Sequence, residues 1–233
     1  MITRKHIIGI ISFLLILIGI GTVYDLQISE CIYNPNLFGI LFAGFGEAPV
    51  YVCLCVSGWL IVRNSGSSEL FYKFIGWSCF LAVVLGTANT VQTVFPQKRW
   101  LITIAIFIYG LVTCFLVRFT KNMNVKGKRC VAQYILTSVL FGVVLVHGIK
   151  LFWGRPRFRL LQNQAEISYL PWWKPNFLFR DSAKQFQIVS EEFKSFPSGH
   201  TAHATTILAL IKIVNCKKNR NITPALFAWY LYI

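Results

Sequence analysis

Long apolar stretches alternate with short polar ones along most of the 233 residues. One helical crossing of a bilayer needs about 20 apolar residues, and fewer where flanking residues compensate. The complete runs are Ile7–Tyr24, Ala48–Val62, Phe74–Phe95, Leu101–Phe119, Val131–Trp153 and Thr201–Val214, and another begins at Pro224. The pattern predicts an all-α fold, a polytopic transmembrane helix bundle with six complete crossings plus the start of a seventh. We see no linker and no repeat, so residues 1–233 are expected to form a single membrane domain.

The seventh apolar run has a typical helix start but is too short to cross a bilayer. Thr223 followed by Pro224 is typical of a helix start. From Pro224 to Ile233 a helix would climb roughly 15 Å, about half of a bilayer's hydrocarbon core. A terminal carboxylate at that depth is costly. We therefore expect the sequence to be a fragment or a truncated product.

Composition supports a membrane protein, and the positions of the cations decide what kind of partner the positive charge suits. Charged residues make up 13% of the chain, whereas about 25% is typical of a soluble domain. The net charge of +15 would suit nucleic acid, but most cations fall in cytoplasmic segments if the N-terminus is cytoplasmic. A second group lies on the outer side, and its members are Lys150, Arg155, Arg157, Arg159, Lys174, Arg180, Lys184 and Lys194. Because this group breaks the orientation rule, we expect an anionic partner there and no nucleic acid.

The densest part of this outer group follows the fifth apolar run. That run is long enough for a full crossing, so Lys150 emerges at the outer face and Arg155, Arg157 and Arg159 follow it. Cations at a helix end also reach for lipid headgroups, and one or two would fit that explanation. Four close together on the outer side indicate phosphate binding, because guanidinium groups bind phosphate oxygens in pairs.

The tetrapeptide Pro197-Ser198-Gly199-His200 opens the sixth run on the same predicted face. Helix capping explains the proline and the serine, but not the glycine followed by histidine. Glycine lets an anion approach the backbone N–H groups of a helix start. Histidine titrates near neutrality and can give a proton to a leaving oxygen. Together with Lys150 and Arg157, the tetrapeptide predicts a phosphate site, with residues 154–198 as its outside loop.

These motifs resemble those of the type 2 phosphatidic acid phosphatase family, the membrane relatives of vanadium haloperoxidases. The family's first motif is Lys, six residues, Arg, Pro, and Lys150 and Arg157 match its spacing, with Phe158 in place of the proline. Its second motif is Pro-Ser-Gly-His, which residues 197–200 match fully. Its third motif is Ser-Arg, five residues, His, three residues, Asp, and it does not occur in this sequence. The phosphatase-like core of residues 131–233 is therefore incomplete.

The resemblance implies a reaction that needs no metal and no cofactor. In the family, the histidine of the third motif is the nucleophile and forms a phosphohistidine, which water then hydrolyses. The histidine of the second motif is the general acid, a role that falls on His200. The phosphate-binding roles fall on Lys150, Arg157, Ser198 and Gly199, with Arg155 and Pro197 as possible accessory residues. Without the nucleophile motif, the 233-residue chain is expected to be inactive.

We expect an integral membrane lipid phosphatase whose site faces outward, in a plasma membrane of prokaryotic type. Phosphatidic acid, phosphatidylglycerol phosphate and polyprenyl pyrophosphate all suit it, and the oligomeric state stays open. The alternative is a non-catalytic membrane protein that binds lipid phosphate, since a binder can lack the third motif. A transporter or channel subunit has less support, because the first four runs carry no charge at mid-membrane.

Several other residues are expected to have structural roles. His147 and His203 could replace the missing nucleophile, but neither is followed by an orienting carboxylate three or four residues on, so packing or a local hydrogen bond is expected. Trp172-Trp173 is interpreted as part of an aromatic belt, with lipid gripping as the alternative. The loop carboxylates are expected to be solvated charges, and they are Asp181, Glu191 and Glu192.

Overall fold

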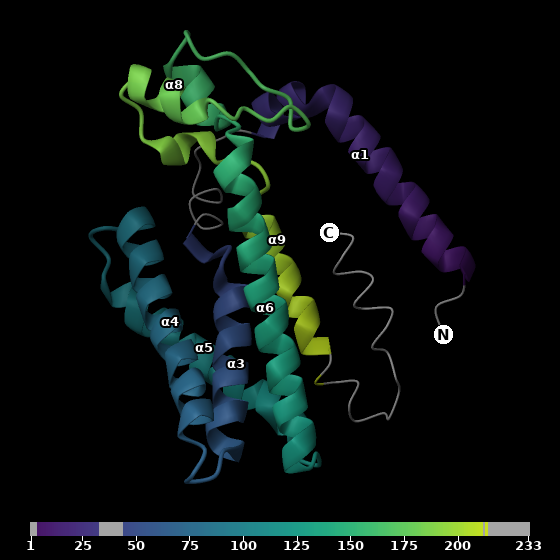
Figure 1. Ribbon diagram of the computed structural model, residues 1–233, viewed down its shortest axis with the longest axis vertical. Coiled ribbons are helices and arrows are strands. Elements are labelled where there is room, and N and C mark those ends of the chain that lie inside the picture. The colour runs from purple at the N-terminus through teal and green to yellow at the C-terminus, as the bar shows by residue number, and fades with distance from the viewer. Residues whose placement is uncertain (1–3, 33–43, 212, 214–233) are drawn as a thin grey trace. The chain divides into compact units, whose positions relative to one another are not determined.

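The computed structural model describes residues 4–32, 44–211 and 213 (Figure 1). Within these residues every regular element is a helix, as the apolar pattern predicted. The run that begins at Pro224 lies outside the described residues. Contacts divide the chain into two compact units. The loop unit comprises Met1–Asn36 and His147–Ser198, and the bundle unit comprises Leu37–Val146 and Gly199–Ile233.

Four helices are long and apolar enough to cross a membrane. They are α1 (Arg4–Ile32), α4 (Leu70–Val94), α5 (Trp100–Val117) and α6 (Val125–Trp153). Two shorter apolar helical stretches match the two shorter runs, α3 (Ala48–Asn64) and the residues 201–210 of α9 (Gly199–Thr205) and η3 (Thr206–Leu210). The all-α class is thus confirmed, and four helices are candidates for membrane spans. The number of six crossings and the cytoplasmic N-terminus stay predictions, as does the single domain, since α6 itself runs through both units.

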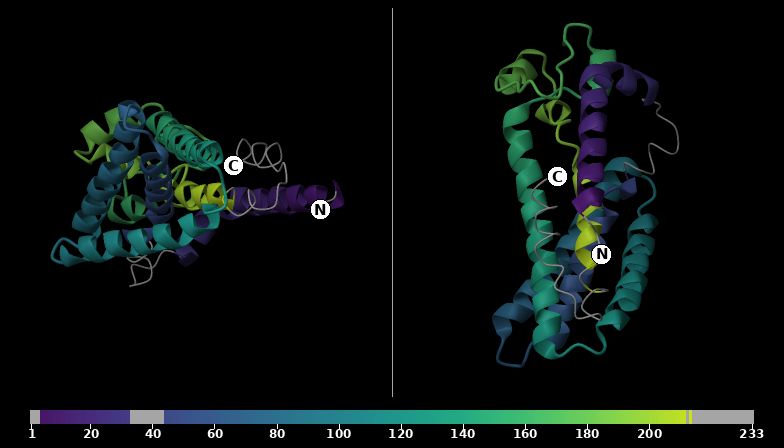
Figure 2. Two further views of the ribbon diagram at one scale, coloured as in Figure 1. Left: turned by 90° about the horizontal axis from the view of Figure 1, so that it is seen from below. Right: turned by 90° about the vertical axis from the view of Figure 1, so that its right-hand side faces the viewer.

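Helix α3 forms the centre of the bundle unit (Figures 1 and 2). It packs against α4, α5, α9 and η3. Helix α6 adds Val131, Ile135 and Val139 to the same apolar core, at a spacing that places them on one face. On α5, only Ala105, Tyr109 and Thr113 are buried. The outward faces of α4 and α5 stay apolar, as expected of helices surrounded by lipid.

Helices α3 and α4 approach each other through two glycines. A Cβ atom on Gly58 would lie 2.8 Å from the carbonyl oxygen of Gly76, and one on Gly76 would lie 2.5 Å from Val62 Cγ2. Small residues at such crossings let two backbones pack closely where lipid supplies no hydrophobic driving force. The turn between the two helices is held by Arg129, which donates to the backbone oxygen of Asn64 and to Glu69 Oε1 at 2.7 Å.

The loop unit contains helices that the sequence did not predict. Residues 154–198 were expected to be an outside loop, yet they contain α7 (Phe158–Asn163), α8 (Phe179–Gln185) and η2 (Ser190–Phe193). These short helices enclose a small apolar core made by Leu160, Phe179, Ala183 and Phe193. Helix α1 loses helical dihedral angles at Tyr24, the residue at which its apolar run ends, and then continues to Ile32.

Candidate phosphate site

The first motif lies around the end of α6, where the chain turns sharply. Lys150 is in the last turn of α6, which ends at Trp153. Gly154 follows with a positive φ of 59°, which side chains rarely tolerate. A Cβ atom there would lie 2.2 Å from the backbone oxygen of Asn176, whose own N–H donates to Trp153 at 2.7 Å. Glycine is therefore required for the turn that directs the chain from Lys150 towards Arg157.

Arg157 occupies the N-cap position of α7, with an extended backbone (φ −73°, ψ 145°). Phe158 is then the first residue of α7. The first helical position is the one that proline favours, and the residue before a proline is usually extended. Phe158 thus stands in a local geometry that also suits the proline of the family motif.

Backbone hydrogen bonds join the segment that carries the first motif to the segment that leads into the second. The N–H of Arg157 donates to the carbonyl of Glu192 at 2.7 Å, and the N–H of Ser195 donates to the carbonyl of Arg155 at 3.1 Å. The hydroxyl of Ser195 donates to the carbonyl of Pro156, also at 3.1 Å. Residues 155–157 and 192–195 therefore lie side by side, so Arg157 is held close to the segment that continues into Pro197 and Ser198.

An aromatic cluster reinforces this connection. The ring of Phe196 lies 5.2 Å from that of Trp153 and 5.6 Å from that of Trp172, measured between centroids. The indole N–H of Trp153 donates to the backbone oxygen of Trp172 at 2.6 Å, and that of Trp172 donates to Thr22 Oγ1 at 3.2 Å. Trp172 therefore packs within the loop unit, whereas Trp173 is 47% exposed and stays available for the predicted aromatic belt.

Lys150 and Arg157, the two cations of the first motif, both attract the carboxylate of Glu191. The pKa of the Glu191 carboxyl is held below its ordinary value, first by a hydrogen bond from Lys194 and then by the attraction of Lys194, Arg157 and Lys150. The Lys194–Glu191 distance is 2.6 Å. Lys150 and Arg157 are thus both within electrostatic reach of one carboxylate, which is the type of charge that a phosphate would bring.

Two neighbouring arginines are engaged by carboxylates. Arg155 pairs with Asp25 Oδ2 at 2.7 Å and donates through Nε to the carbonyl of Leu170 at 3.1 Å. Arg159 forms a double hydrogen bond with Glu192. Glu191 and Glu192 were expected to be solvated, but both are ion-paired in the structure. Arg155 has a structural partner on α1, and its accessory role at a phosphate stays a prediction.

The second motif lies at the boundary between the units. Pro197 and the exposed Ser198 end the loop unit, and Gly199 begins α9 in the bundle unit, so the helix starts where the sequence predicted. The side chain of His200 lies outside the described residues. The structure therefore brings the segments of Lys150, Arg157 and Ser198 together, and places Gly199 and His200 directly after them along the chain.

The sequence did not predict one pair of side chains near the second motif, His203 and Glu47. His203, one turn after His200, is 5% exposed, and its Nδ1 lies 3.6 Å from Glu47 Oε1. The hydroxyl of Tyr51 donates to the other oxygen of Glu47 at 2.8 Å. His203 does have a carboxylate beside it, contributed by the start of α3 and not by its own helix. Only the coincidence of polar residues at the ends of two apolar runs could have pointed to this pair.

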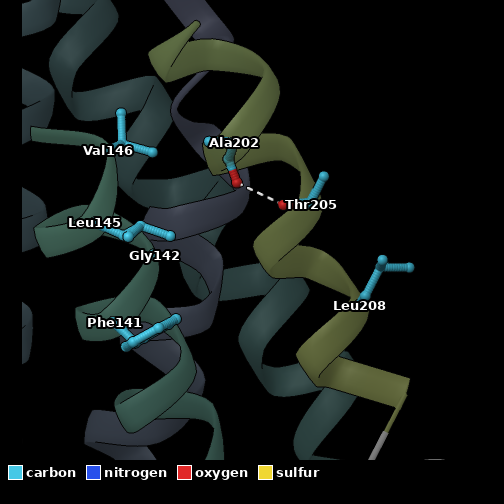
Figure 3. A pocket seen from close by; sticks show the side chains of 7 residues that line it. All are labelled: Phe141, Gly142, Leu145, Val146, Ala202, Thr205 and Leu208. Atoms are coloured by element: carbon cyan, nitrogen blue, oxygen red, sulfur yellow. Dashed lines mark hydrogen bonds between the residues drawn. The ribbon is translucent and has the colours of Figure 1, made fainter. Parts of the chain in front are cut away.

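The cavity between α6 and α9 is too small and too apolar to hold a lipid headgroup. It measures about 50 Å³ and lies among Phe141, Leu145, Ala202 and Leu208 (Figure 3). Its polar side chain, Thr205, already donates to the carbonyl of Ala202 at 2.7 Å. Ligand pockets usually measure 300 Å³ or more. This gap therefore reflects helix packing next to the second motif.

Comparison with known protein families identifies the region that holds both motifs. The family model described as the PAP2 superfamily matches residues 132–233, from the first half of α6 onward. The match confirms the resemblance inferred from the two motifs. No curated protein and no solved structure matches the chain.

Proposed function

Since residues 132–233 match the family model of the PAP2 superfamily, we propose that the protein is a membrane-embedded lipid phosphatase. The family match and the long apolar helices support a phosphatase-type hydrolase that acts on a phosphate ester within a membrane. In the proposal, Lys150, Arg157, Ser198 and the N–H of Gly199 bind the phosphate, and His200 protonates the leaving oxygen. The substrate is a lipid phosphomonoester or pyrophosphate.

The observation that carries the proposal is the pairing of residues 155–157 with residues 192–195. These hydrogen bonds hold the end of the first motif beside the segment that leads into Pro197, which lies about 40 positions later in the sequence. A phosphate site needs its binding groups at fixed separations, because a tetrahedral anion can be recognised only by groups arranged around it. The hydrogen bonds within the loop unit support such an arrangement for Arg157 and the segment that precedes Ser198.

The charge distribution supports the same site. Glu191 stands within electrostatic reach of Lys150 and Arg157 and is hydrogen-bonded to Lys194. A phosphate with more negative charge than a carboxylate would be attracted more strongly to these cations and would compete with Glu191 for them. We propose that the phosphate binds on the Lys150 and Arg157 side of Glu191.

The chemical step follows the family's route. A histidine nucleophile bonds to phosphorus as the bond from phosphorus to the lipid oxygen breaks, and His200 gives its proton to that oxygen. Water then hydrolyses the phosphohistidine and releases phosphate. The motif that supplies the nucleophile does not occur in residues 1–233. For these residues alone we expect phosphate binding without turnover.

The finer assignments are part of the same proposal. Apolar helices support a membrane location, and we propose a plasma membrane, six crossings, a cytoplasmic N-terminus and a site that faces outward. Phosphatidic acid, phosphatidylglycerol phosphate and polyprenyl pyrophosphate are the candidate substrates, because each presents a terminal phosphate at bilayer height. The second candidate function, a non-catalytic binder of lipid phosphate, is favoured by the missing nucleophile motif.

Release of phosphate from labelled phosphatidic acid tests the proposal, in a chain extended to include the third motif. Replacing His200 by alanine or Arg157 by glutamine should lower turnover about a hundred- to thousandfold. Arg159→Gln is the matched control for Arg157, because it removes a neighbouring charge that Glu192 already binds. Wild-type turnover in the His200 variant would disprove the acid's role. Phosphate binding without any turnover in the extended chain would establish the binder instead.

A further inference from the structure

A basic cavity lies in the loop unit, formed by residues that neither motif uses. It measures about 500 Å³ and opens between the end of α6, α8 and η2. Its cationic side chains are Arg180, Lys184 and Lys194, and among the described residues that line it none is acidic. A volume of this size is in the range of small-molecule sites.

The cavity keeps a positive charge after its neighbours are counted. Arg180 and Lys184 are four positions apart on α8 and therefore share a face of that helix. Among the described residues no carboxylate forms an ion pair with either of them, in contrast to Arg155 and Arg159. Lys194 is paired with Glu191, and Asp181 follows Arg180 on α8, so these two carboxylates offset two of the three positive charges. The remaining charge favours an anionic ligand.

Apolar groups surround the same cavity. Leu151, Phe179 and Ile188 line it, and Leu151 is 46% exposed. Leu178 and Val189, which adjoin lining residues in the chain, are 69% and 72% exposed. Exposed apolar side chains around a basic hollow are typical of a surface that meets a membrane. Leu151 also belongs to α6, one of the membrane-spanning candidates, so the hollow lies where a span ends.

We propose that this cavity binds the phosphate group of an anionic phospholipid, as an accessory lipid site separate from the motif residues. The guanidinium of Arg180 and the ammonium of Lys184 bind the phosphate oxygens, and the lipid's acyl chains lie along the exposed apolar residues beside it. The site holds the loop unit against the membrane surface. It requires no catalysis, so the proposal stands independently of the phosphatase activity.

Binding of radiolabelled short-chain phosphatidylglycerol to the purified chain, in an uncharged detergent, tests this site. Phosphatidylglycerol is a phosphodiester without a terminal phosphate, so its binding is read without turnover. The double variant Arg180→Gln/Lys184→Gln should bind it about thirtyfold more weakly, since each cation near a lipid surface contributes about a fivefold effect. The matched control, Lys98→Gln/Arg99→Gln, removes the same charge from the turn before α5 and should bind within twofold of wild type.

Further variants and ligands test which ligand binds and whether it binds in this cavity. Lys184→Arg keeps the charge and should keep the affinity, which separates charge loss from misfolding, and circular dichroism should show equal helicity in all variants. Wild-type affinity in the double variant overturns the proposal, and so does loss of binding in Arg157→Gln alone, which would place the lipid in the motif site. Equal binding of phosphatidylcholine would overturn the role of charge. Equally tight binding of glycerol phosphate would replace the lipid by a free phosphate ester.

Discussion

The Nδ1 atom of His203 lies 3.6 Å from Glu47 Oε1, which brings the last turn of α9 beside the start of α3. His203 is buried, and Tyr51 holds the second oxygen of Glu47. The helix that begins at Gly199 is thus attached to the central helix of the bundle unit one turn beyond His200. This contact restrains α9, the helix that contains His200.

The Glu47–His203 pair should contribute measurably to stability. We expect Glu47→Gln and His203→Gln each to lower the free energy of unfolding by about 1–2 kcal/mol, because each leaves a partly buried polar group with a poorer partner. In a double-mutant cycle the two effects should overlap by about 1 kcal/mol. Thermal unfolding in detergent, followed by tryptophan fluorescence, measures this coupling. Strictly additive effects would show that the two side chains do not interact.

Gly154→Ala should destabilise the loop unit strongly. The added methyl group meets the backbone oxygen of Asn176 and the ring of Phe179, at a positive φ that alanine also disfavours. We expect a loss of about 3 kcal/mol and weaker phosphate binding. Gly148→Ala is the control, because it lies within α6 with no atom within 4 Å of the added methyl group. That variant should be neutral or up to about 1 kcal/mol more stable.

Substitution of Arg155 should affect mainly stability, whereas substitution of Arg157 should affect mainly phosphate binding. Arg155→Gln breaks the pair with Asp25 and should lower Tm, while phosphate affinity changes less than about threefold. Arg157→Gln should leave Tm nearly unchanged and weaken phosphate binding at least about tenfold. Equilibrium dialysis with inorganic phosphate, combined with thermal melts, measures both properties. A large loss of affinity in the Arg155 variant would instead establish its accessory phosphate role.

Tyr169 should titrate at unusually high pH. Burial, together with the hydrogen bond that its hydroxyl donates to Asp25 at 2.6 Å, raises the pKa of Tyr169 to about 12. In the unfolded chain this pKa is near 10. The folded state therefore binds the proton more tightly, and its stability should fall as pH rises from about 10 to 12. The ultraviolet difference titration between wild type and Tyr169→Phe should show this late phenolate, and a difference curve centred near 10 would contradict the buried hydrogen bond.

The apolar runs predicted the long helices well because lipid requires every backbone group to find its partner within its own helix. The run Ala48–Val62 became α3 almost unchanged, and Val131–Trp153 became the apolar part of α6. The motifs singled out Lys150 and Arg157 as candidates for phosphate binding, because the spacing of a motif can be read from a short stretch of sequence. Short helices such as α8 depend on tertiary packing against residues such as Phe193, which no periodicity reveals.

The partners of these residues were equally invisible in the sequence. Asp25 and Arg155 are 130 positions apart, and nothing in either segment indicates the other. Glu47 reaches His203 only because α3 and α9 pack together. Ion pairs between distant segments follow from the fold, so the sequence could indicate that the outer cations need anions but could not assign Asp25 to Arg155.

The pair between Arg155 and Asp25 also imposes an order on biosynthesis. A ribosome adds roughly 5–20 residues each second, so Asp25 is made on the order of ten seconds before its partner. Throughout that interval the carboxylate near the end of α1 has to be stabilised by water, lipid headgroups or the insertion machinery. The loop unit is therefore completed late, when the segment that carries Arg155 closes onto a helix made on the order of ten seconds earlier.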